Sequence, residues 1–287
     1  MTLDPDAFLT TKEVADLLRV KERKVYDLAA AGEIPHRRIT GKLLFPRTDL
    51  TAWLKGDEAV SDNQAPMVLA GSHDPLLDWA LRASGSGLAS FYDGSGDGLR
   101  RFCDGQAAAA GMHLPEDGRW NLASVQASAP KDAVLLGWAR RVQGLILPQG
   151  SMVARLSDLL GERLALRQEG SGARGLFDQL AREEGLEPSA FEAQASLART
   201  ETEAAAAVAG GEVAAALGLE AMSRQYRLGF VPLATESFDI LINRRAYFSP
   251  AWQTLWAFTK TPEFAERAES LGGYDLQQLG QVRWLSP

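Results

Sequence analysis

Three serines in the second part of the chain each lie beside a glycine where an apolar run gives way to a helical pattern. Ser72 follows the run 67–71, Ser95 follows 88–92, and Ser171 follows 163–167. Serine hydroxyls and the free N–H groups of a helix start can hydrogen-bond an anion, and glycine permits close approach to the backbone. Because ligands bind at the carboxyl ends of strands in open α/β sheets, we expect the three serines to line one cleft.

Other polar residues and glycines stand at the same junctions or on the adjoining strands. Neutral hydroxyls suit a metal oxyanion, whereas charged side chains would suit an organic or zwitterionic ligand, and both classes stay open. His73 can equally be a turn residue, and Arg174 an exposed cation. The additional candidates for ligand contacts are His73, Asp74, Gly96, Gln143, Gly172, Arg174, Thr200 and Glu236.

A second group of candidate residues lies in the first 55 residues and is mostly basic. This head carries ten Lys and Arg against eight Asp and Glu, whereas the remainder carries twenty against twenty-nine. Attraction to nucleic-acid phosphates therefore belongs to the head. The candidates for DNA contacts are Lys21, Arg23, Lys24 and Tyr26 on a predicted helix, and Arg37, Arg38 and Lys42 on a predicted hairpin.

The spacing of apolar residues predicts the elements that would position these groups. In the head it indicates helices over about 11–18, 22–31 and 47–54, with strands at 34–39 and 43–45. A second helix after a tight turn can enter a major groove, and a hairpin beside it forms a wing. In the body, strands at 67–71, 88–92, 144–148, 163–167, 229–233 and 238–242 accompany helices at 75–83, 96–105, 173–185 and 200–210, which predicts an α/β sheet covered by helices.

The head resembles a known family of DNA-binding domains. The strings that carry this likeness are Phe8-Leu9-Thr10-Thr11-Lys12-Glu13-Val14-Ala15, Gly32-Glu33-Ile34-Pro35, and Phe45-Pro46 followed by Asp49-Leu50 and Trp53-Leu54. They are similar to the excisionase-like and MerR-type winged helix-turn-helix family. The resemblance implies that the head binds DNA.

The body also resembles a known family. The motifs are Gly71-Ser72-His73-Asp74-Pro75, Gly94-Ser95-Gly96-Asp97-Gly98, Arg140-Arg141-x-Gln143-Gly144, Gly170-Ser171-Gly172 and Gly272-Gly273-Tyr274-Asp275. They are similar to periplasmic-binding-protein-like domains of the molybdate- and tungstate-binding type. The resemblance implies two α/β lobes with a ligand between them, crossed by hinge strands near 138–148 and 228–237. Thr200 and Glu201 stand where many relatives carry a histidine, which leaves the ligand open.

These patterns predict a one-component transcription regulator. We expect a winged helix-turn-helix domain at 1–55, a polar linker at 56–66, and a type II periplasmic-binding-protein-like domain at 67–287. Lobe I would comprise about 67–142 and 232–287, and lobe II about 143–231. The expected partners are a double-stranded DNA operator, a second copy of the chain in a homodimer, and a small anion. Molybdate or tungstate is the first choice of anion, and an organic acid or zwitterion the second.

Several function classes are disfavoured. One cysteine, Cys103, permits no intrachain disulfide, and no apolar run approaches the roughly 20 residues of a membrane span. Without a signal-like segment we expect a cytoplasmic protein. The consecutive residues Ser72, His73 and Asp74 cannot form a catalytic triad, and no metal cluster or P-loop motif occurs, so we expect neither catalysis nor a cofactor. A cytoplasmic solute-binding protein without a regulatory role is the alternative from another class, and a recombination directionality factor would normally lack the large body.

Overall fold

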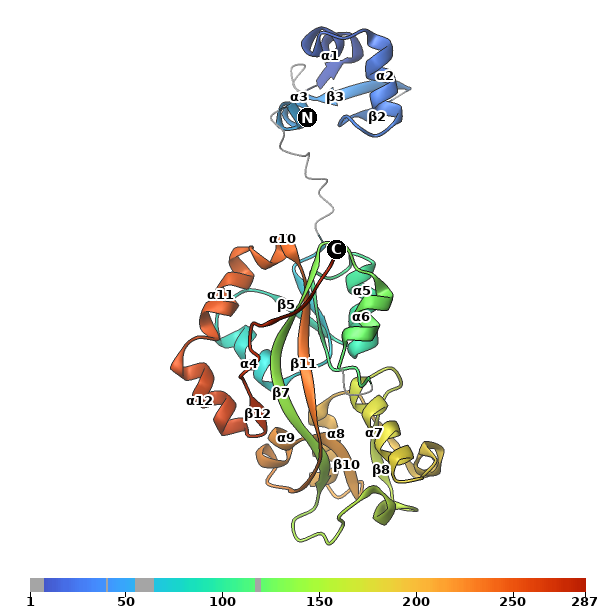
Figure 1. Cartoon of the computed structure of the whole chain (residues 1–287), viewed down its shortest axis with the longest axis vertical. Coiled ribbons are helices and arrows are strands. Elements are labelled where there is room, and N and C mark those ends of the chain that lie inside the picture. Colours follow the sequence, from blue (N-terminus) through green and yellow to red (C-terminus); the bar gives the residue numbers. More distant parts are fainter. Residues whose placement is uncertain (1–7, 40, 55–64, 117–119) are drawn as a thin grey trace. The chain divides into compact units, whose positions relative to one another are not determined.

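The computed structural model describes residues 8–39, 41–54, 65–116 and 120–287 (Figure 1). The chain divides into two compact units, residues 1–64 and 65–287. The first contains the head, residues 1–55, and the second is the body. Of the predicted linker 56–66, residues 56–64 lie outside the described residues, so the linker stays a prediction.

The head combines three helices with a three-stranded antiparallel sheet of order β1-β3-β2. Thr10 and Glu13 form a reciprocal capping box at the start of the first helix, and Arg19, at a φ of 54°, ends it in a tight turn. Val14, Val25 and Phe45 are fully buried between the helices and the sheet. The elements are β1 Phe8–Thr10, α1 Thr11–Leu18, α2 Glu22–Ala30, β2 Arg37–Ile39, β3 Lys42–Pro46 and α3 Arg47–Leu54.

The body is built on one ten-stranded mixed sheet, which confirms the predicted α/β class. In one half, β4 (Val68–Gly71) lies parallel to β5 (Ala89–Tyr92) and β6 (Ala109–Met112). In the other half, β8 (Leu164–Arg167) lies parallel to β9 (Ser196–Ala198) and β10 (Ala215–Leu219). We call these halves lobe I and lobe II.

Two long antiparallel strands, β7 (Ala133–Leu147) and β11 (Gly229–Asn243), run side by side through both lobes (Figure 1). Their pairing shifts register between Pro232 and Ala234 and again between Phe238 and Asp239. Such bulges bend a strand and increase its twist. The two shifts flank Glu236, which places this residue where the strands pass between the lobes. Two short strands also pair with β7, β12 (Tyr274–Asp275) and β13 (Val282–Leu285).

Helices follow most of the strands. In lobe I these are α4 Pro75–Ala83, α5 Ser95–Cys103, α6 Leu122–Ser128, α10 Arg244–Tyr247, α11 Pro250–Phe258 and α12 Pro262–Leu271. In lobe II they are the 3₁₀ turns η2 Leu156–Leu159 and η3 Pro188–Gln194, and the helices α7 Gly172–Glu183, α8 Glu201–Ala209 and α9 Glu220–Gln225. In the described part of the chain, no helix combines the length and apolar character that crossing a bilayer requires.

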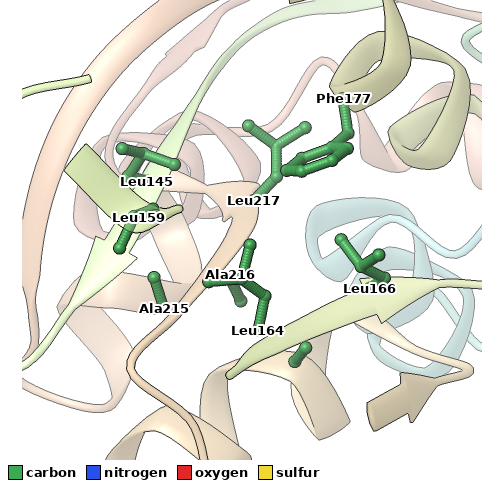
Figure 2. A pocket seen from close by; sticks show the side chains of 9 residues that line it. Leu145, Leu159, Leu164, Leu166, Phe177, Ala215, Ala216 and Leu217 are labelled. Atoms are coloured by element: carbon green, nitrogen blue, oxygen red, sulfur yellow. The ribbon is translucent and has the colours of Figure 1, made fainter. Parts of the chain in front are cut away.

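An apolar pocket in lobe II belongs to its core rather than to a ligand site. Figure 2 shows Leu145 of β7, Leu164 of β8, Leu217 of β10 and Phe177 of α7 around it. These residues are 1–4% exposed, and the space between them is too small for a water molecule. The pocket therefore marks the packing of α7 against the sheet.

Candidate functional site

The starts of α5 and α7, one from each lobe, meet at the junction between the lobes. The backbone N–H of Gly96 donates to the carbonyl of Gly170 at 3.4 Å. A Cβ atom on Gly94 would lie 3.5 Å from the Cα of Ser171. The structure therefore brings Ser171, the N-cap of α7, next to the loop that leads into α5.

The structure brings Ser72 and Ser95 together at this junction. Their hydroxyl oxygens are 2.7 Å apart, and both residues are buried. The Ser95 hydroxyl also accepts a hydrogen bond from the backbone N–H of His113, at 3.0 Å. Two hydroxyls have two protons, and their mutual hydrogen bond uses one of them. The pair therefore keeps one proton that it can donate to a ligand.

His113, which follows β6, forms the contact between lobe I and the start of α7. A Cβ atom on Gly172 would lie 2.3 Å from the His113 carbonyl oxygen and 2.7 Å from its ring. Glycine is therefore required at this position for α7 to approach lobe I so closely. The predicted candidate Gly172 thus acts in the structure through the absence of a side chain.

A fully buried arginine, Arg141 of β7, links two carboxylates across the hinge strands. Its Nη1 atom donates to Asp74 at 2.9 Å, and its Nη2 atom donates to Glu236, which lies directly opposite on β11. The guanidinium lies 4.3 Å from the ring centre of Phe238. Because buried charges are stable only when paired, each of the three depends on the other two.

Asp74 is the N-cap of α4, and four donors surround its carboxylate. They are the backbone N–H of Leu77 at 2.7 Å, the Trp138 indole at 3.0 Å, the Tyr274 hydroxyl at 2.7 Å and Arg141. Burial, together with the neighbouring Asp74 charge, raises the pKa of Tyr274 well above its usual value of 10. Tyr274 therefore stays a donor, and the Asp74 carboxylate is fully occupied by the protein.

Glu236 is likewise bound by protein donors. Its Oε1 atom accepts from Arg141 and from the Gln143 amide at 3.1 Å, and its Oε2 atom lies 2.8 Å from His113 Nδ1. Burial would raise the pKa of Glu236, but the charges of Arg141 and His113 outweigh it and lower this pKa to about 2. Glu236 is therefore a permanent anion at neutral pH, and the predicted candidates Gln143 and Glu236 lie in one cluster.

Three predicted site residues make other contacts. His73 packs edge-on against Tyr92, with its Nε2 atom 3.9 Å from Asp78. Arg174 pairs with Asp178 at 2.8 Å and also with Glu192. Thr200 caps α8 by accepting from the backbone N–H of Glu203 at 3.0 Å.

A groove of about 360 Å³ opens beside Ser171 at the mouth of this junction. Leu114 and Pro115, which follow His113, line one side of it. The other side is lined by residues of lobe II: Glu169, Gly170, Ser171, Arg174, Gly175 and Asp178. The volume is within the usual range for small-ligand pockets. Among the described residues, no three or more His, Cys, Asp or Glu side chains gather in a way that could hold a metal ion.

Sequence reasoning missed three residues of the cluster as candidates, His113, Arg141 and Tyr274. Arg141 and Tyr274 stand within the motifs Arg140-Arg141-x-Gln143 and Gly272-Gly273-Tyr274, where alternation along β7 could have placed Arg141 beside Gln143. His113 follows a strand of small residues, Ala109 to Met112, which has no strong β-propensity. Neither this strand nor His113 at its end could therefore be predicted from the sequence.

In the head, every predicted DNA-contact residue is exposed: Lys21, Arg23, Lys24, Tyr26, Arg37, Arg38 and Lys42. No side chain caps the start of α2, which leaves its first N–H groups open to a phosphate. Register places Arg37 opposite Leu44 and Arg38 opposite Leu43. Lys42 lies opposite Ile39, which is two residues from Arg37 and therefore on the same face, so Arg37 and Lys42 share one face of the hairpin. Arg38 projects from the other face, which carries buried Leu43.

Comparison with known proteins identifies both units. The model of the PBP superfamily domain matches residues 79–260, and that of a helix-turn-helix domain matches residues 8–57. The chain belongs to the PBP superfamily and carries an N-terminal helix-turn-helix domain. The predicted fusion of these two kinds of domain is confirmed, whereas the molybdate-type specificity stays a prediction.

Relatives and solved structures extend this likeness. An uncharacterized protein of Bacillus subtilis, YvgK, is 22% identical over 299 residues, covering 95% of this chain and 96% of its own. A phosphate ABC transporter substrate-binding protein from Clostridium perfringens, with bound phosphate, is 12% identical with a TM-score of 0.55, covering 75% of this chain and 99% of its own. A hydrogen-peroxide-bound OxyR mutant from Corynebacterium glutamicum is 13% identical with a TM-score of 0.51, covering 91% and 89%. These two structures show a shared fold.

Proposed function

We propose that this protein is a transcription regulator whose head binds double-stranded DNA and whose body senses a small anion. The observation that carries the proposal is one chain with two sites. One is an exposed basic helix-turn-helix, and the other is a buried junction where Ser72, at the end of β4, lies near Ser95 and Ser171 at the starts of α5 and α7. We further propose that it acts as a homodimer, because a single winged head makes few base contacts. Catalysis forms no part of the proposal.

On the DNA side, the second helix would read bases and the hairpin would contact phosphates. Arg23, Lys24 and Tyr26 are exposed on α2, whose uncapped start suits a backbone phosphate. Arg37 and Lys42 project together from one face of the hairpin. This shared face makes them the pair that can contact one stretch of DNA backbone.

The DNA side is tested by measuring affinity for a DNA fragment, selected with the full chain from a random library, over a range of salt concentrations. The double variant Arg37→Ala with Lys42→Ala should bind all sequences more weakly. It should also lower the slope of log affinity against log salt by about 2, since each phosphate contact contributes about 0.9. Arg38→Ala, on the other face, is the comparison and should change the slope less. An unchanged slope in the double variant would show that this face does not contact the backbone.

On the ligand side, Ser72, Ser95 and the helix starts are neutral donors of the kind that bind oxyanions. Molybdate or tungstate is therefore the first candidate. The second candidate is an organic acid or zwitterion. Ser72→Ala should weaken anion binding about tenfold, equal to the loss of one hydrogen bond of about 1–2 kcal/mol. Wild-type affinity in Ser72→Ala would place the anion elsewhere.

A further inference from the structure

Gln143 has a buried hydrogen-bond acceptor for which the described residues supply no donor. Its Nε2 atom donates to Glu236 Oε1 at 3.1 Å. An ionised carboxylate can only accept, so the amide must turn its nitrogen toward Glu236. This orientation leaves Oε1 without a partner in the described part of the chain, although Gln143 is 0% exposed. A buried acceptor of this kind requires a donor from a bound molecule or from water.

The position of Gln143 connects this acceptor with the junction of the lobes. Gln143 and His113 both contact the Glu236 carboxylate, and His113 in turn packs against Gly172 at the start of α7. Through Glu236 and His113, the free acceptor is linked to Ser95, whose hydroxyl accepts from the His113 backbone, and to the start of α7. This cluster can donate hydrogen bonds from one group of atoms and accept one at Gln143.

The hydrogen-bonding groups of the cluster also favour a ligand that carries a donor. Asp74 and Glu236 are carboxylates, and the Nη1 and Nη2 atoms of Arg141 are already committed to them. A fully ionised oxyanion brings only acceptors, which could pair with the serine hydroxyls or with Arg141 Nε, a buried donor that has no partner among the described residues. Such an anion has no hydrogen-bond donor, so it would leave Gln143 Oε1 unpaired.

We propose that the anion sensed by this body carries a hydrogen-bond donor of its own, which Gln143 Oε1 accepts. The Ser72 and Ser95 hydroxyls and the starts of α5 and α7 bind its anionic group. This inference rests on the proposed function and replaces molybdate or tungstate, its first ligand candidate, with an anion that carries a donor. Two sources share the required chemistry: a singly protonated tetrahedral oxyanion such as monohydrogen phosphate, and a small hydroxy or amino carboxylate. Molybdate, tungstate and sulfate carry no proton at neutral pH and therefore have no hydrogen-bond donor.

The test is isothermal titration of the full chain at neutral pH with matched probes. Monohydrogen phosphate and sulfate are both tetrahedral and differ in the donor, while molybdate and tungstate are further donor-free probes. L-Lactate and L-serine represent the organic source. At least one donor-bearing probe should bind about tenfold or more tightly than every donor-free probe, because a site built around a hydroxyl rejects analogues that lack it. Tighter binding of phosphate than of lactate and serine identifies an inorganic ligand, and the reverse an organic one.

A pair of variants tests whether Gln143 causes the preference for the donor-bearing probe. Gln143→Met removes the amide at similar length and should abolish the preference for the donor-bearing probe. Gln126→Met makes the same change on the exposed face of α6 and should leave it intact. Sulfate, molybdate or tungstate binding as tightly as every donor-bearing probe would overturn the inference, as would a preference that survives in Gln143→Met. The comparison of probes in the unchanged chain does not depend on the folding of either variant.

Failure of this inference is distinguishable from failure of the proposed function. If a donor-free anion binds best and alters DNA binding, the regulator stands and the inference is wrong. If a donor-bearing anion binds best but leaves DNA affinity unchanged, the inference stands and the regulator is wrong.

Discussion

Arg141 is the residue on which the charge balance of the hinge depends. It is fully buried and pairs with Asp74 and Glu236, which are also fully buried. Burial would lower the pKa of Arg141, but the two carboxylates more than compensate and raise it. Replacement of Arg141 would leave two uncompensated buried charges.

We predict that Arg141→Met lowers the free energy of unfolding by about 3–5 kcal/mol, the usual cost of breaking a buried ion pair. Arg140→Met is the matched control, because Arg140 is the exposed neighbour on the same strand. Urea denaturation of both variants measures the difference. Equal stability of the two variants would contradict the assignment of a buried charge cluster.

Glu236 predicts a specific loss of stability in acid. Its pKa is lowered from 4.5 to about 2 in the folded chain, so the folded state binds a proton less readily than the unfolded state. The resulting stability is present above about pH 5 and is lost as the pH falls toward 2, by about 3 kcal/mol. Between about pH 5 and 2, the free energy of unfolding should fall less steeply with pH in Glu236→Gln than in the wild-type chain. It should fall as in the wild type in Glu162→Gln, an exposed control. Parallel curves for the wild-type chain and Glu236→Gln would refute the prediction.

At the scale of elements, periodic helices were predictable from residue spacing, whereas the full length of the hinge strands was not. The prediction 75–83 coincides with α4, because Asp74 and Pro75 mark its start and its apolar positions keep helical spacing. By contrast, apolar spacing indicated β7 only from Gly144 onward, and the family resemblance implied a hinge strand from about residue 138. Its first part, Ala133 to Val142, is apolar at nearly every position except the Arg140-Arg141 pair, and such a run has no alternation to distinguish strand from helix.

The candidate site was predictable to the extent that it lies at strand ends. Ser72, Ser95 and Ser171 could be placed because each follows a recognisable strand and begins a helix. The partners of Asp74 could not be found in this way, since Arg141 and Tyr274 are 67 and 200 residues distant in the sequence. Only tertiary pairing brings them together.

The contact between α7 and lobe I supplies a prediction at this scale. Gly172→Ala would place a methyl group 2.3 Å from the His113 carbonyl, so α7 must move away from lobe I. We expect the free energy of unfolding to fall by about 1–3 kcal/mol, the typical cost of overpacking. Gly210→Ala at the exposed end of α8, where the new Cβ atom would lie 3.3 Å from the Ala206 carbonyl oxygen, is the control. Thermal or urea denaturation should separate the two, and equal stability would mean that α7 is not held against His113.

At the scale of the whole molecule, the proposed mechanism requires anion binding by the body to change the DNA affinity of the head. An anion can change DNA binding only if it binds differently to the DNA-competent and DNA-incompetent forms of the chain. Closure of the lobes on an anion at the junction of α5 and α7 would provide that difference by changing how two bodies pair in a dimer. For a chain of 31.0 kDa, light scattering should therefore report about twice that mass, and a strict monomer both free and on DNA would contradict the dimer.

The most direct test of the regulator is titration of the tightest-binding anion of the probe panel into the full chain, with and without a saturating DNA fragment selected by the same chain. Coupling between sites is reciprocal, so DNA should change the dissociation constant of the anion by the factor by which the anion changes that of DNA. We predict a factor between about 5 and 150, equal to about 1–3 kcal/mol. Equal dissociation constants in the two titrations would show that the body does not act on the head, and would contradict the regulator.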